Sequence, residues 1–144
     1  MATKQDFTEQ EWETLRRGVT GAGMLVSLSD RSFFDSFKEA GALARHLGEA
    51  RKGGDSELVR ELAEGRGTGF GITDKPDEIE RETLEALRSA AELLRAKAPD
   101  ELEGYRSFVL ELARSVGAAA GGGDDAERTT VEKISAALGD GAAA

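Results

Sequence analysis

Apolar residues recur every three to four positions along most of this chain, and that periodicity limits its fold more than any other feature. The clearest instance begins at Pro76 and continues past Pro99 to Val116, and these are the only two prolines of the chain. A period of 3.6 residues gives an α-helix one apolar face, whereas a half-buried strand needs strict alternation. Because no stretch alternates cleanly for long, the sequence predicts an all-α protein, a compact bundle of about six helices joined by short loops.

Six segments carry the helical pattern, and each is bounded by residues that start or stop helices. We expect helices over about 9–28, 32–50, 56–65, 76–97, 99–116 and 125–138. The side chains expected to line the shared core are Trp12, Leu15, Val19, Ala22, Val26, Phe33, Phe37, Ala40, Leu43, Ala44, Leu47, Leu58, Val59, Leu62, Ile79, Thr83, Leu84, Leu87, Ala90, Ala91, Leu94, Leu102, Tyr105, Phe108, Val109, Leu112, Ala113, Val116, Val131, Ile134, Ala137 and Leu138. Thr8 and Glu11 have the spacing of a capping box at the start of the first helix. Gly139 should stop the last helix.

Three glycines interrupt the first predicted helix: Gly18, Gly21 and Gly23. Each costs roughly 1 kcal/mol of helix propensity relative to alanine. The segment is therefore a weak or kinked helix, or a neighbouring helix approaches it closely at these small residues, and both explanations can hold together.

Length and charge narrow the class of protein. The 144 residues suit a single helical domain, with an ordered core over about 8–139 and a flexible tail at 140–144. The 28 acidic and 19 basic residues give a net charge of −9 without a basic cluster, which argues against nucleic acid as a partner. The N-terminal segment is polar, and no apolar run approaches the ~20 residues of a membrane span. We expect a cytoplasmic, bacterial protein without a transmembrane segment.

The segment "VGAAAGGGDDAERTTVEKISAALG", residues 116–139, joins a glycine run to a cluster of acids. A phosphate-binding loop is excluded. Such a loop follows a strand, whereas this glycine run follows a predicted helix, and the two aspartates would repel the phosphate that the glycine amides should attract. Asp124, Asp125 and Glu127 could instead bind calcium or magnesium through oxygen ligands. They lack the alternating acids of an EF-hand, and an N-cap with acids in the first helical turn accounts for every one of them. The sequence favours the helix start.

The end of the chain, "ELARSVGAAAGGGDDAERTTVEKISAALG", resembles the second half of TerB-like proteins, the helical domain family of the tellurite-resistance group. "GMLVSLSDRSFFDSFKEAGALARHLG" repeats this order of small-residue helix, aspartate turn and second helix. Leu43 and Leu47 then correspond to Ile134 and Leu138. The resemblance covers residues 9–50 and 110–139, and it implies a helical bundle built from two pseudo-repeated units.

The resemblance also implies acidic turns that bind a divalent cation. Carried over to this chain, the ligands are Asp30 and Asp35 in the first unit, with Asp124, Asp125 and Glu127 in the second. The first turn departs from the family pattern, because Arg31 follows Asp30 where the family has glycine, and Asp35 replaces a glutamate. These departures weaken the first turn as a metal site.

Other candidate chemistry is sparse. His46 is the only histidine, and a solvated or edge-packed position is its simplest interpretation. Glu78, Glu82, Glu85 and Glu92 interleave with Arg81 and Arg88, which predicts a solvated helix face held by pairs three and four residues apart. No serine lies in a nucleophile elbow, so no Ser/His/Asp set can be assembled.

Three functions remain open. The first is a non-enzymatic TerB-like domain that acts through protein partners in a stress or tellurite response, and the second is a divalent-metal binder that uses the acidic turns. The third is an enzyme or small-ligand carrier with the loop "GRGTGFGITD" as its lid, and it ranks lowest. Incomplete burial of Phe33, Phe34 and Phe37 would favour a homodimer.

Overall fold

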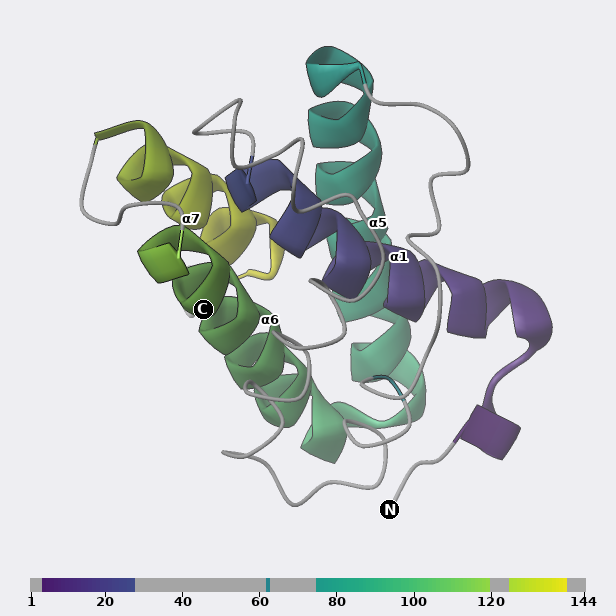
Figure 1. Ribbon diagram of the computed structural model, residues 1–144. Helices are drawn as coiled ribbons and strands as arrows, with labels where there is room; N and C mark the ends of the chain where they lie inside the picture. The colour runs from purple at the N-terminus through teal and green to yellow at the C-terminus, as the bar shows by residue number, and fades with distance from the viewer. Residues whose placement is uncertain (1–3, 28–61, 63–74, 120–124, 140–144) are drawn as a thin grey trace.

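Four α-helices make up most of the part of the chain that the computed structural model describes, which is residues 4–27, 62, 75–119 and 125–139 (Figure 1). The elements are a 3₁₀ turn at Lys4–Asp6, α1 (Glu9–Ser27), α5 (Pro76–Lys97), α6 (Pro99–Ala119) and α7 (Asp125–Ala137). The predicted all-α class is confirmed over these residues. Of the six predicted helices these are four; 32–50 and 56–65 lie outside the described residues except for Leu62, which is helical and buried.

Helix α1 occupies the centre of the described bundle. Figure 1 shows it crossing α5, with α6 and α7 together on one side of α5, and each of the four helices contacts the other three. Every residue from Gly18 to Ser27 is buried, so the second half of α1 is enclosed on all of its faces. A helix enclosed in this way tolerates small residues well, because each one lets a neighbouring helix approach more closely.

The turn between α5 and α6 consists of one residue, Ala98. Its N–H donates to the Leu94 carbonyl at 2.7 Å, and its carbonyl accepts from the Glu101 N–H at 2.8 Å. Pro99 can follow at once, since the first residue of a helix needs no N–H donor. The predicted junction between these helices is confirmed. Because it is so short, it limits the angle between α5 and α6, which both pack against α1.

The core contains the apolar stripe that the periodicity predicts. The expected core residues within the described ranges are buried, except Leu84, Leu102 and Val131, which are half-buried and pack against the others. Thr83 is the unusual member, because its buried hydroxyl has no hydrogen-bond partner. Gly139 has φ 74°, the left-handed conformation of a helix C-cap, and it ends α7 as predicted.

Gly18 is the point where α1 meets both α5 and α6. The Tyr105 hydroxyl of α6 donates to the Leu15 carbonyl at 2.8 Å. A Cβ atom added at Gly18 would lie 2.5 Å from that hydroxyl oxygen and 3.0 Å from Leu87 Cδ2 of α5. Helix α1 nevertheless runs unbroken over 19 residues. The close-approach explanation for this glycine is therefore confirmed.

The start of α1 is fastened locally and to α5. The predicted capping box is confirmed: the Thr8 N–H donates to Glu11 Oε1 at 2.9 Å, and the Glu11 N–H donates to Thr8 Oγ1 at 3.1 Å. Phe7 and Trp12 pack with their ring centroids 6.3 Å apart, which is the hydrophobic staple that accompanies such a box. Lys97 Nζ donates to Glu11 Oε1 at 2.5 Å and lies 5.8 Å from the Phe7 ring centroid.

This arrangement predicts a pH dependence of stability. The hydrogen bond from Lys97, with the Thr8 N–H second, holds the pKa of Glu11 below its ordinary value of 4.5. A lowered folded-state pKa contributes stability above the unfolded value, and that contribution is lost as pH falls through the folded value. Glu11→Gln should therefore be less stable than the wild type at neutral pH, with the difference vanishing in strong acid. Urea denaturation of both proteins, at several pH values from neutral to strongly acidic, measures the difference in stability.

The matched control is Glu9→Gln, which removes one carboxylate from the same helical turn. The side chain of Glu9 forms no hydrogen bond or ion pair with the described residues, so its effect at neutral pH should be smaller. A Glu11→Gln difference that stays constant with pH would contradict the assignment.

Candidate functional site

A polar groove between α1 and α5 is the candidate site in the described part of the chain. Its volume is about 320 Å³. The groove is open to solvent and lined by Thr14, Arg17, Glu82, Glu85, Ala86 and Ser89. The first two residues come from α1 and the other four from α5, so the site exists only where the two helices cross.

Helix periodicity explains why these side chains face the groove. Ile79, Thr83 and Leu87 of α5 face the core. Glu82, Glu85 and Ser89 follow one another at spacings of three and four, so they form a single row on the flank of the helix beside those core residues. Ala86 is buried between them and leaves room where a larger side chain would fill the groove.

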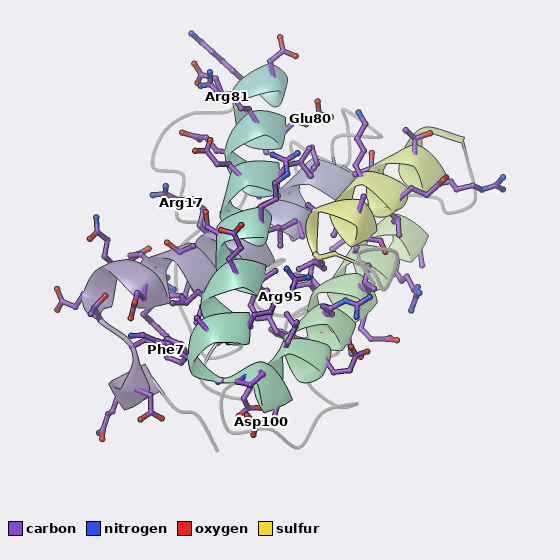
Figure 2. All side chains as sticks on the ribbon, turned by 180° about the vertical axis from the view of Figure 1, so that it is seen from behind. Phe7, Arg17, Glu80, Arg81, Arg95 and Asp100 are labelled. Carbon is purple, nitrogen blue, oxygen red and sulfur yellow. The ribbon has the colours of Figure 1, made fainter. Side chains whose placement is uncertain are left out.

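Among the residues that the structure describes, the charged groups of the groove have no ion-pair partner. No described oppositely charged group lies within 4.0 Å of the charged atoms of Arg17 on α1, or of Glu82 and Glu85 on α5. Charges elsewhere do pair. Glu80 lies on the other flank of α5 from Arg17 (Figure 2). Its carboxylate accepts from Lys133 Nζ of α7 at 3.0 Å. Opposite charges therefore line one groove without neutralising each other.

The two hydroxyl groups that line the groove differ in availability. Thr14 Oγ1 donates to the Gln10 carbonyl at 3.1 Å, a bond within its own helix. Ser89 is exposed, and no hydrogen bond of its side chain occurs in the structure. No histidine or lysine lines the described groove to act as a base toward Ser89. The geometry suits the binding of charged groups more than nucleophilic chemistry.

The two groups with shifted pKa values in the described part of the chain lie outside the groove. Burial raises the pKa of Tyr105, whose hydroxyl is held by the Leu15 carbonyl in the core. The pKa of Glu11 is lowered at the helix cap described above. Both shifts follow from structural roles, so neither group forms a proton-transfer pair with the groove residues.

The metal ligands implied by the family resemblance cannot be placed together. Asp30, Asp35 and Asp124 lie outside the described residues. Asp125 is the first residue of α7 and Glu127 falls in its first turn, in accord with the helix-start interpretation. Within the described ranges no group of three or more His, Cys, Asp or Glu could hold a metal ion. The metal site stays a prediction.

Sequence reasoning missed the groove. It assigned Glu82 and Glu85 to helix pairs with Arg81 and Arg88, but neither glutamate forms such a pair. It did not single out Arg17 at all. The row at 82, 85 and 89 is visible in the sequence, but its meeting with Arg17 depends on how α1 crosses α5.

Comparison of the chain with protein-family models, with curated proteins and with solved structures finds no match. None of the helices in the described ranges is both long enough and apolar enough to span a membrane.

Proposed function

We propose that this protein is a non-enzymatic, TerB-like helical domain that acts through a protein partner, and that the partner docks on the α1–α5 groove. The observation that carries the proposal is the set of unpaired opposite charges on Arg17, Glu82 and Glu85. Charges arranged in this way give a partner its orientation and its specificity, because a wrong partner would place like charges together.

The rest of the described structure supports a binding role. The groove of about 320 Å³ is at the small end of the range for ligand sites, which suits one or two side chains of a partner. The net charge of −9 favours a partner with a basic surface and speeds its approach. The TerB resemblance connects this binding with a stress or tellurite response.

The test is an affinity capture from a lysate of the source organism, with the double variant Glu82→Gln/Glu85→Gln beside the wild type. The two substitutions keep the size of each side chain and remove both carboxylates from the groove. We expect at least one protein that the wild type retains to be lost or clearly reduced with the variant, as a tenfold weaker affinity, about 1.4 kcal/mol, would produce.

Glu111→Gln/Glu132→Gln is the matched control. It makes the same change in net charge at exposed positions on α6 and α7, away from the groove. This control should retain the same proteins as the wild type, and circular dichroism should show both variants folded. Equal retention by the groove variant and the control would contradict the proposed function.

A further inference from the structure

The charges of the groove point to the chemistry of the group that enters it, an inference that rests on the proposed function. Glu82 and Glu85 are three residues apart on one helix, so two carboxylates lie near each other on the same wall. No cation in the described ranges is paired with either of them. One positive charge placed between them would relieve their mutual repulsion, and a lysine or arginine side chain provides it.

Arg17, on the α1 wall of the groove, requires a negatively charged group from the ligand. Its guanidinium is a planar donor that binds a carboxylate through two parallel hydrogen bonds. It has no carboxylate partner in the structure, although two carboxylates line the same groove. A ligand that satisfies both walls must therefore carry a cation on one side and a carboxylate on the other.

The size of the groove limits how far apart those two charges can be. A volume of about 320 Å³ is small for a ligand site, so both charges should come from a very short segment. A C-terminal lysine or arginine carries a permanent side-chain cation and a carboxylate on one residue, so it can meet both walls at once. We propose that the groove binds the C-terminus of a partner that ends in lysine or arginine, with the side chain between Glu82 and Glu85 and the terminal carboxylate on Arg17.

Short peptides test this inference directly. The probes are an acetylated Gly-Ala-Ala-Lys with a free C-terminus, the same peptide as its C-terminal amide, and acetylated Gly-Ala-Ala-Ala with a free C-terminus. Nuclear magnetic resonance titration of the labelled full chain measures each affinity. We expect the first peptide to bind about tenfold more tightly than either of the others, because each of those lacks one charge-assisted contact.

Variants assign the two contacts to their walls. In Arg17→Gln the advantage of the free C-terminus over the amide should disappear, while the advantage of lysine over alanine persists. In Glu82→Gln/Glu85→Gln the pattern should reverse. Glu111→Gln/Glu132→Gln should bind as the wild type does, and circular dichroism confirms that all variants are folded.

Several results would overturn the inference. These are equal affinity for the acid and the amide, no shift of the groove amides with any peptide, or tighter binding of free lysine, which would indicate a small-molecule ligand. The capture experiment distinguishes a failure of the C-terminal recognition from a failure of the proposed function. If the groove variant loses a captured protein while the peptides fail to bind, the proposed function stands and the C-terminal recognition is wrong.

Discussion

Replacing Tyr105 with alanine is expected to lower the free energy of unfolding by about 3–5 kcal/mol, the usual cost of removing a large aromatic side chain from a core. Among the described residues Tyr105 is the largest side chain that is fully buried, with 0% of its surface exposed. Its hydroxyl also bonds the Leu15 carbonyl, so the substitution removes a link between α6 and α1 together with the ring. Chemical denaturation followed by circular dichroism measures the change.

Two further variants separate the ring from the hydroxyl. Tyr105→Phe should cost only about 0.5–1.5 kcal/mol, because one hydrogen bond is lost and the core stays filled. Leu110→Ala, at a half-buried position on the same helix, should cost less than Tyr105→Ala, because less apolar surface is lost from the interior. A Tyr105→Ala loss below that of Leu110→Ala would show that the ring does not fill the centre of the bundle.

The local features of this fold could be predicted because neighbouring residues determine them. Thr8 and Glu11 are three residues apart, and their reciprocal bonds join atoms within one helical turn. Pro99 cannot continue α5 without clashing with the preceding turn, so it begins α6. The inner stripes follow in the same way from a single period, and this is why the burial of residues such as Leu15 and Leu112 could be predicted.

The contacts between helices could not be predicted in the same way. Lys97 reaches Glu11, and Lys133 reaches Glu80, across helices whose relative positions no single segment encodes. The groove has the same origin, since Arg17 meets the row on α5 only through the crossing of α1 and α5. Charge spacing within one helix predicts pairs along that helix, and for Glu82 such pairs did not form.

Gly18 combines a local feature with contacts between helices. Its lack of a side chain is visible in the sequence, but the neighbours that surround it are not. In an isolated helix Gly18→Ala would stabilise by roughly 1 kcal/mol. In this bundle we expect the opposite, a loss of about 1–3 kcal/mol from overpacking. The added methyl would lie 2.5 Å from the Tyr105 hydroxyl oxygen, closer than a real Cβ contact permits, and the buried ring cannot move away without breaking the bond to Leu15.

Gly104→Ala is the matched control on α6. A Cβ there meets nothing within 4 Å, so the substitution should show only the helix-propensity gain. We expect it to raise the free energy of unfolding by about 0.5–1 kcal/mol. Equal effects of the two glycine substitutions would mean that α1 and α6 do not meet at Gly18.

The double variant Gly18→Ala/Tyr105→Phe tests the cause of the loss. Removing the hydroxyl vacates the space that the new methyl needs, and the remaining neighbour, Leu87 Cδ2 at 3.0 Å, has to give by only a few tenths of an ångström. The double variant should therefore be more stable than the sum of the single effects predicts, by about 1–2 kcal/mol. Additive effects would place the strain at Leu87, and Gly18→Ala/Leu87→Val would then restore the stability instead.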